Sequence, residues 1–292
     1  MLSNGLLLNI NTSLETALQQ KVFIGRTEQV FGGDINKTYL LETNAGKFFL
    51  KVNAASAGDM FEKESNGLNI LVAANALTAP KPIVTGNSGE HIFLVMEYIE
   101  KRKPALDFWQ QFGHGLAALH KTTQSQFGLL EDNYIGTIPQ SNSMANTWAE
   151  FYAQQRIMPL MQKALKQNKC LVSDVQAVET ICGKFADIFP IEPPALLHGD
   201  LWGGNFMVGN DGQPVIYDPA VYYGHREMDI AMTMLFGGFD KQLYDDYNNV
   251  YPLQAGWRQR VELCQLYPLL VHLLLFDGHY YNSVMDIIKR YQ

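Results

Sequence analysis

The chain has 292 residues, of which 47% are hydrophobic and 17% are charged, enough apolar residues for a sizeable core and too few charges for a disordered protein. The formal net charge is −7. Nonspecific nucleic-acid binding rests on positive charge, so this composition argues against it.

Cysteine content and apolar runs indicate the compartment. The three cysteines, Cys170, Cys182 and Cys264, are an odd number without metal-site spacing, which suits a reducing compartment. We see no secretory signal, and the apolar run over 263–276 is too short and too interrupted to span a bilayer. We therefore expect a cytoplasmic protein that binds neither nucleic acid nor a membrane. Its oligomeric state is open, with a monomer favoured.

The first expected elements are a short helix and an antiparallel meander. The sequence Thr12-Ser13-Leu14-Glu15 fits a capping box, which predicts a helix over about 12–20. Three alternating strands are expected next, over 27–31, 38–42 and 47–52. The pair Gly32-Gly33 lies at the first bend, where a glycine pair usually marks a plain turn.

The third of these strands carries Lys51 between apolar neighbours. A lysine in such a strand must meet a counter-charge or a phosphate. The helix expected over 59–75 places Glu62 and Glu64 in its early turns. Either one pairs with Lys51, as the strand lysine and helix glutamate of kinases do, or both are solvated acids favoured by the helix dipole. We prefer Glu64 as the partner.

An apolar strand over 91–99 leads into the polar segment 100–104. This exit is typical of a crossing between two lobes, where backbone groups can bind adenine. We therefore expect a nucleotide-binding domain over 1–99 and a second domain, with the catalytic loop and substrate site, over 100–292.

The remaining elements are expected to be mainly helical. The first expected helix lies over 107–122, the second starts with the stretch 148–157, and two more lie over 173–189 and 257–276. Between the first two, the irregular stretch 126–142 is rich in Gly, Asn and aromatic residues. A loop of this length in a compact domain is often functional.

The stretch 196–208 carries the most chemical information. Apolar residues lead into a loop that holds Asp200 and, five positions later, Asn205. A hairpin then returns the chain, so that Asp218 is expected at the end where the loop began. The spacing from His198 to Asn205 matches the kinase pattern H-R-D-L-x-x-x-N.

Two carboxylates and an amide in such a set suit phosphoryl transfer from ATP. One carboxylate orients and deprotonates a hydroxyl, while an amide oxygen and the second carboxylate hold Mg²⁺, which prefers oxygen ligands. The alternative is an ordinary hairpin whose Asp and Asn residues serve turns. Asp218 at the end of an apolar strand speaks against it, since an unpaired carboxylate is costly to bury there.

Three polar residues after this hairpin have open roles. Asp229 opens an apolar helix, and we expect it to cap that helix or to accept hydrogen bonds from the backbone of the catalytic loop. His225 and Arg226 are either surface turn residues or contacts on the phosphate side.

Taken in order, the glycine loop, the strand lysine, the helix glutamate and the two acidic motifs resemble the protein-kinase-like fold of small-molecule kinases. Several stretches are similar more narrowly to the fructosamine-3-kinase / ketosamine-3-kinase family: Phe-Phe-Leu-Lys-Val over 48–52, Asn-Thr-Trp over 146–148, Gln-Arg-Ile over 155–157, Leu-Leu-His-Gly-Asp-Leu-Trp-Gly-Gly-Asn over 196–205, Tyr-Asp-Pro-Ala-Val-Tyr-Tyr-Gly-His-Arg-Glu over 217–227 and Leu-Phe-Gly-Gly-Phe over 235–239. The match covers nearly the whole chain.

The resemblance implies an α+β, two-lobed protein-kinase-like fold, with a small antiparallel-sheet N-lobe containing one main helix and a larger, mostly helical C-lobe. It implies ATP-dependent phosphorylation of a sugar hydroxyl on a ketosamine, free or protein-bound, as in deglycation repair. By position, Asp200 would be the catalytic base, and Asn205 and Asp218 would bind Mg²⁺. The implied nucleotide-binding residues are Gly32, Gly33, Lys51, Glu64, Met96, Glu97 and Tyr98.

The chain departs from the protein-kinase pattern at Gly199, which replaces the arginine of H-R-D, and at Pro219, which replaces the phenylalanine of D-F-G. The first departure fits a constitutively active small-molecule kinase. No cysteine precedes Cys170, so the redox-sensitive glycine-loop disulfide of some family members is not expected.

Two other functions are kept as alternatives. One is an aminoglycoside- or choline-type phosphotransferase of the same fold. The other is a catalytically silent nucleotide-binding module, which the presence of the base, the lysine and both metal ligands disfavours.

Overall fold

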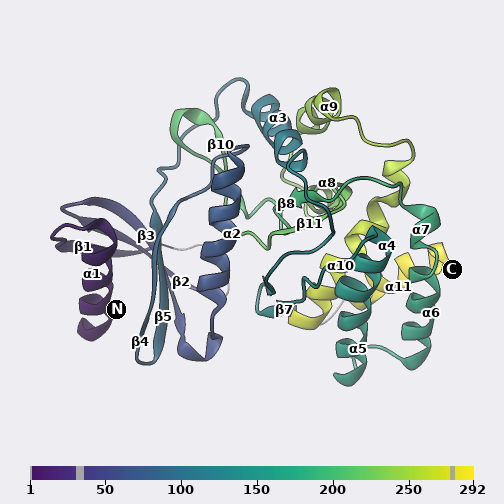
Figure 1. Cartoon of the computed structure of the whole chain (residues 1–292), viewed down its shortest axis with the longest axis horizontal. Helices are drawn as coiled ribbons and strands as arrows, with labels where there is room; N and C mark the ends of the chain where they lie inside the picture. Colours follow the sequence, from purple (N-terminus) through teal and green to yellow (C-terminus); the bar gives the residue numbers. More distant parts are fainter. Residues whose placement is uncertain (1, 31–35, 277–279) are drawn as a thin grey trace. The chain divides into compact units, whose positions relative to one another are not determined.

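The computed structural model describes residues 2–30, 36–276 and 280–292, which form two compact units (Figure 1). Unit 1 comprises Met1–Leu106 and Met207–Asp218, and unit 2 comprises Asp107–Phe206 and Pro219–Gln292. The expected division into domains over 1–99 and 100–292 stays a prediction. The two compact units have other boundaries, because residues 207–218 belong to unit 1. None of the helices in these three described ranges is long and apolar enough to cross a membrane.

Unit 1 is built on a five-stranded antiparallel sheet with the order β1-β2-β3-β5-β4 (Figure 1). Its strands are β1 Ile24–Val30, β2 Lys37–Thr43, β3 Gly46–Ala54, β4 Pro82–Ser88 and β5 His91–Glu97. The expected meander of the first three strands is confirmed, because β1 pairs with β2 and β2 with β3 in antiparallel register.

Alternation along β3 gives the sheet two different faces. Leu50 and its even-numbered neighbours belong to the apolar core shared with helix α1 (Asn4–Leu18). Lys51 points to the opposite face, where it is registered between Thr38 of β2 and Leu94 of β5. Helix α2 (Met60–Ala74) covers that face, and the expected helix over 59–75 is confirmed (Figure 1).

Helix α1 begins earlier than the sequence pattern indicated. Ser3 is the N-cap and its side chain accepts a hydrogen bond from the Leu6 backbone N–H at 3.3 Å. Thr12 lies inside the helix and donates its hydroxyl to the Leu8 carbonyl at 3.0 Å, so the predicted start at residue 12 is wrong. Burial of one helical face from Leu6 onward outweighs the local capping pattern.

The polypeptide returns to unit 1 through a short hairpin, which confirms the expected one. Strands β9 (Phe206–Val208) and β10 (Pro214–Ile216) are neighbours, joined by a turn that contains Asn210–Gly212. The Ile216 N–H donates to the Thr78 carbonyl at 3.0 Å, which ties the hairpin to the sheet-bearing unit. Asp218 lies two residues further along the chain.

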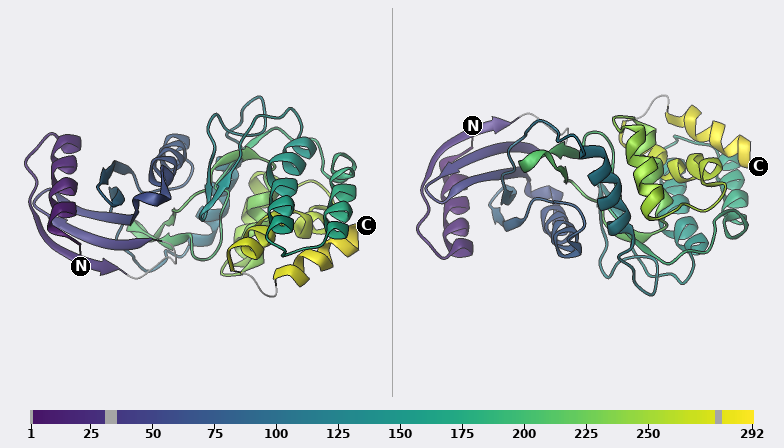
Figure 2. Two further views of the ribbon diagram at one scale, coloured as in Figure 1. Left: turned by 90° about the horizontal axis from the view of Figure 1, so that it is seen from below. Right: turned by 90° about the horizontal axis from the view of Figure 1, so that it is seen from above.

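Unit 2 is mainly helical. Its helices are α3 Phe108–His120, α4 Trp148–Phe151, the π-helical turn Tyr152–Ile157, α5 Met158–Lys166, α6 Val172–Cys182, α7 Phe185–Ile188, α8 Glu227–Leu235, α9 Lys241–Val250, α10 Trp257–Phe276 and α11 Tyr280–Tyr291. The expected helix over 173–189 is two helices, because α6 ends at Cys182 with Gly183 as its C-cap and α7 begins at Phe185. Helices α3 and α9 pack so closely that a Cβ on Gly113 would lie 2.6 Å from a carbonyl of α9 (Figures 1 and 2).

Two pairs of short strands complete unit 2. Strand β8 (Ala195–Leu197) pairs with β11 (Tyr222–Gly224), and β6 (Asn133–Ile135) pairs with β7 (Ile138–Gln140). The first pair brings the residues before the loop that holds Asp200 and Asn205 beside the residues that follow Asp218 in the chain. The second pair lies within the segment that the sequence presented as an irregular loop.

We expect Leu6→Ala to lower the free energy of unfolding by about 2–4 kcal/mol, because Leu6 is 3% exposed and its loss leaves a cavity in the core. Urea unfolding followed by circular dichroism measures the change. Leu8→Ala in the same helix is the control, since Leu8 is 67% exposed and should change stability by no more than about 0.5 kcal/mol. Equal effects of the two changes would contradict the early start of α1.

Candidate active site

The buried lysine of β3 lies between two carboxylates within unit 1. Lys51 Nζ is 2.6 Å from Glu64 Oε1 of α2 and also contacts Asp218 Oδ1, at the end of the hairpin. Lys51 is 4% exposed, whereas Asp218 is 38% exposed. The preference for Glu64 over Glu62 as the lysine's partner is confirmed, because Glu62 is exposed in the first turn of α2.

The electrostatics of this cluster keep the lysine charged. Burial alone would lower the pKa of Lys51, but Asp218 and Glu64 outweigh it and raise the pKa above its ordinary value. Burial raises the pKa of Glu64, Lys51 opposes this effect, and the charge of Asp218 adds to it. A single ammonium thus binds two carboxylates, that of Glu64 on α2 and the partly exposed one of Asp218.

In unit 2, the loop after β8 holds an acid and an amide in contact. Asn205 Nδ2 donates to Asp200 Oδ2 and to the Asp200 backbone carbonyl, both at 2.9 Å. Asn205 is 6% exposed, so this buried amide is held in place by its two hydrogen bonds to Asp200. The Asp200 N–H donates to His198 Nδ1 at 3.2 Å, which closes the turn. The spacing of five residues therefore brings the two side chains together, as the sequence predicts.

Asp229 holds the backbone of this loop. It is the third residue of α8 and not its cap, so the capping alternative is wrong. Its carboxylate accepts from the His198 N–H at 2.8 Å and the Gly199 N–H at 2.9 Å, which confirms the other expected role. Burial would raise the pKa of Asp229, but hydrogen bonding and charge from His120 and its loop partners lower it overall.

His120 also binds Asp229, a contact that the sequence did not lead us to expect. It is fully buried at the end of α3, with Nε2 3.2 Å from Asp229 Oδ2 and Nδ1 2.8 Å from the Tyr247 hydroxyl. The available signal was a histidine on the apolar face of the expected helix, one helical turn after Leu116.

Gly199 occupies a conformation and a space that exclude a side chain. Its φ is +82°, and an added Cβ would lie 2.1 Å from the Ala220 carbonyl oxygen. The Ala220 N–H donates to the His198 carbonyl at 2.9 Å, so the loop and the segment after Asp218 touch along their backbones. Close backbone packing therefore explains why glycine replaces the arginine of the protein-kinase pattern.

His225 and Arg226 are both buried, so the expectation of surface turn residues is wrong. Arg226 donates through Nε and Nη2 to the two carboxylate oxygens of Glu192, each at 2.7 Å, and to the carbonyls of Tyr251 and Pro252, also at 2.7 Å. All three guanidinium nitrogens thus bind partners within unit 2, which speaks against the phosphate-side alternative. Burial works against ionisation of Glu192, but Arg226 outweighs it and lowers the pKa.

The expected adenine-side residues lie at the end of β5. Met96 is buried, Glu97 is exposed and its N–H donates to the Lys81 carbonyl at 2.8 Å, and Tyr98 is half-buried beyond the strand. Gly32 and Gly33 lie outside the described residues.

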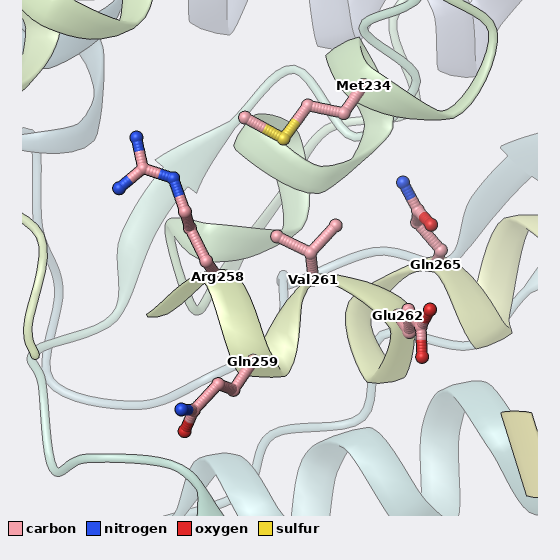
Figure 3. Close-up of a pocket in the computed structure, with 6 residues that line it drawn as sticks. All are labelled: Met234, Arg258, Gln259, Val261, Glu262 and Gln265. Atoms are coloured by element: carbon pink, nitrogen blue, oxygen red, sulfur yellow. The ribbon is translucent and has the colours of Figure 1, made fainter. Parts of the chain in front are cut away.

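A surface pocket of about 530 Å³ lies in unit 2 (Figure 3). It is formed by Met234 of α8 and five residues of α10, namely Arg258, Gln259, Val261, Glu262 and Gln265. None of the predicted site residues lines it.

Comparison with known proteins identifies relatives over most of the chain. The family model for fructosamine kinase matches residues 7–292. A "probable ketoamine kinase" of Synechocystis sp. is 38% identical over 268 residues, covering 91% of this chain and 90% of that protein. A chloroplastic protein-ribulosamine 3-kinase of Oryza sativa subsp. indica is 36% identical over 270 residues, covering 89% and 77%.

Solved structures extend the comparison to the fold. The crystal structure of a "putative fructosamine-3-kinase" from Haemophilus somnus has a TM-score of 0.88, 29% identity and 96% coverage of both chains. An aminoglycoside phosphotransferase bound to gentamicin has a TM-score of 0.64 at 16% identity, covering 100% of this chain and 97% of that one, which shows a common fold alone. The predicted α+β protein-kinase-like fold is confirmed.

We expect Asp229→Asn to lower the free energy of unfolding at pH 7 by about 2–3 kcal/mol, because hydrogen bonds to a buried charge are lost. Folding lowers the pKa of Asp229, so its contribution is present above the unfolded pKa of about 3.9 and is lost as the pH falls through the lower folded value.

Urea unfolding of both proteins at several pH values measures this effect. The difference between them should be constant from about pH 7 to pH 5 and should shrink only below about pH 4. A difference that already disappears above pH 5 would contradict the role of the Asp229 charge.

Proposed function

The chain belongs to the fructosamine kinase family and is an ATP-dependent kinase of ketosamines, and we propose that Asp200 is the base that accepts the proton of the sugar hydroxyl. The observation that carries this proposal is the fixed orientation of Asp200. Asn205 donates a hydrogen bond to the Asp200 carboxylate. Asp229 accepts hydrogen bonds from the backbone of the two residues that precede Asp200.

In the proposed reaction the sugar oxygen attacks the γ-phosphorus of ATP in line, and ADP leaves. Asp200 orients the hydroxyl and takes its proton as the new oxygen–phosphorus bond forms. General-base assistance of this kind contributes about 10²–10⁴ in rate, and correct positioning adds to it. The hydrogen bonds from the loop backbone to Asp229 support such positioning, because they leave the Asp200 carboxylate little freedom to move.

Lys51 is proposed to bind the α- and β-phosphates. Its charge is retained despite burial, since two carboxylates lie beside it. In this proposal Glu64 keeps the ammonium in place from α2 while the nucleotide oxygens become its further acceptors. The nucleotide site is proposed to include Gly32, Gly33, Met96, Glu97 and Tyr98, the last three at the end of β5.

Asn205 and Asp218 are the proposed ligands of Mg²⁺. Their donor chemistry fits, because Mg²⁺ takes oxygen ligands and is commonly held by one or two protein groups together with substrate phosphates. Asn205 turns its nitrogen to Asp200, so its amide oxygen faces another direction. Bound there, the metal supplies charge neutralisation for the phosphate oxygens.

The substrate is proposed to be a ketosamine, either free or attached to a protein. The relative from Oryza sativa is named for protein-bound ribulosamine, which makes that compound a useful first substrate. An aminoglycoside or choline acceptor is not favoured, since the aminoglycoside phosphotransferases share the fold at low identity. A silent module is disfavoured because the residues proposed as the base, the phosphate-binding lysine and the two metal ligands are all present in the sequence.

The proposed location is the cytoplasm, and a monomer is the favoured state. Cys170, Cys182 and Cys264 are free thiols, which suits a reducing compartment.

We expect Asp200→Asn to lower kcat for ribulose-lysine phosphorylation by at least about 10³, because the base is lost while the side-chain volume is kept. The Kd for ATP with Mg²⁺, measured by calorimetry, should change less than about threefold, since only the transition state is affected. Asp211→Asn is the control, since Asp211 is exposed in the turn of the hairpin. Full activity of Asp200→Asn would refute the assignment of the base.

We expect Lys51→Met to raise the KM for ATP and to lower kcat, with kcat/KM falling by about 10²–10³, because the removed ammonium no longer meets the phosphates. Steady-state kinetics over a range of ATP concentrations measure both constants. Lys47→Met on the same strand is the matched control, since Lys47 is exposed and its loss should leave both constants unchanged. The proposed role fails if the two variants behave alike.

A further inference from the structure

A buried network of amide side chains lies in the segment between α3 and α4. Asn133, Gln140 and Asn142 are 7%, 2% and 0% exposed. Gln140 Nε2 donates to Asn133 Oδ1 at 2.8 Å, and Asn142 Nδ2 donates to the same oxygen at 2.9 Å. Because two of the amides donate to the same oxygen of the third, the three amides fix one another's orientation.

The network reaches out to two backbone carbonyls. Gln140 Nε2 also donates to the Ala220 carbonyl at 3.2 Å, and Asn133 Nδ2 donates to the Val221 carbonyl at 2.8 Å. These residues follow Asp218 and Pro219 directly in the sequence. The amides therefore bind the segment 220–221 from one side.

Arg156 and Tyr267 close the network on its far side. Arg156 Nη2 donates to Asn142 Oδ1 at 2.7 Å, and its guanidinium lies 4.0 Å from the centre of the Tyr222 ring. The Tyr267 hydroxyl donates to Gln140 Oε1 at 2.5 Å. Burial raises the pKa of Tyr267, with Arg156 opposing the increase, so the hydroxyl keeps the proton that it donates. Every amide of the network is thereby held by a neighbour.

The same segment touches the catalytic loop on its other side. The Ala220 N–H donates to the His198 carbonyl at 2.9 Å, and the Ala220 carbonyl lies where a side chain of Gly199 would project. Tyr222, on which Arg156 stacks, pairs with Leu197 at the start of that loop. The segment 220–222 is thus bound by the loop on one side and by the amide network on the other.

We propose that Gln140 and Asn133 are positioning residues for phosphoryl transfer, which fix the backbone at 220–221 and through it the loop that carries Asp200. This inference rests on the proposed function. Its physical basis is that the side-chain oxygen and nitrogen of Asn133, Gln140 and Asn142 all have hydrogen-bond partners, so these three amides favour one conformation, whereas apolar side chains would fill the same space without directing those carbonyls. Arg156 Nε, at the edge of the network, is buried without a hydrogen-bond partner among the described residues.

The principal test is Gln140→Met, which keeps the approximate length of the side chain and removes the donor to the Ala220 carbonyl. We expect kcat to fall about tenfold or more, while the KM values for ATP and ribulose-lysine change less than about threefold. Hydrogen–deuterium exchange of peptides that cover 198–200 and 219–224 should become about tenfold faster.

Two controls separate positioning from general destabilisation. Gln126→Met changes an amide of the same segment whose Nε2 bonds the Asn146 side chain at an exposed position, and should leave both readouts unchanged. Val284→Ala removes packing from the buried face of α11. It lowers the stability of the fold, as Gln140→Met does, but changes no residue of the amide network. If Val284→Ala lowers kcat and speeds exchange at 219–224 as much as Gln140→Met does, the proposal is overturned.

Tyr267→Phe provides a second variant if Gln140→Met does not fold. It keeps the aromatic ring and removes only the hydroxyl that donates to Gln140. We expect exchange at 219–224 to become about two- to fivefold faster, and unchanged exchange in the folded variant would overturn the proposal.

Exchange also separates this inference from the proposed function. If the unmodified enzyme shows no turnover of ribulose-lysine or fructose-lysine, the proposed function fails. Faster exchange at 219–224 in Gln140→Met would then still support the control of this backbone by Gln140.

Discussion

A single buried carboxylate fixes the backbone of the loop in unit 2 that carries Asp200. Asp229 is 1% exposed, and burying its charge would be costly without compensation. The compensation comes from two backbone N–H groups of the loop and from His120. Because the charge requires these donors, the loop backbone can take only the path that supplies them. The position of Asp200 follows from that requirement and from the contact with Asn205.

The two units use buried charge differently. In unit 1, one ammonium is shared by Glu64 and Asp218, and the Asp218 carboxylate is partly exposed. In unit 2, Arg226 and Glu192 pair with nearly ideal bidentate geometry, and Arg226 donates further to backbone carbonyls. The first arrangement suits a charge that meets a ligand, whereas the second suits a charge that holds the fold together.

The sequence was most informative where the determining interactions are local. The spacing from Asp200 to Asn205, the meander and the helix that carries Glu64 all depend on neighbours within a few residues or on strict alternation. It failed at the start of α1, where a valid capping pattern lies inside a longer amphipathic helix. The burial of Arg226 depends on Glu192, 34 residues away, and the amide network depends on carbonyls 80 and 88 residues away. No short-range pattern contains such pairings.

The π-helical turn Tyr152–Ile157 has a consequence for how this chain tolerates change. A π turn contains one residue more than an α turn, so it advances the following helix by one position. Both Tyr152 and Arg156 are fully buried there, one against α10 and the other against the ring of Tyr222. Deleting the extra residue would let a regular α-helix form with α5 in its present orientation, whereas winding the same residues as an α-helix would rotate α5 by about 100° relative to α4. In that second case the locally more regular helix would present the wrong face to the core, so the irregular turn sets the register between the two helices.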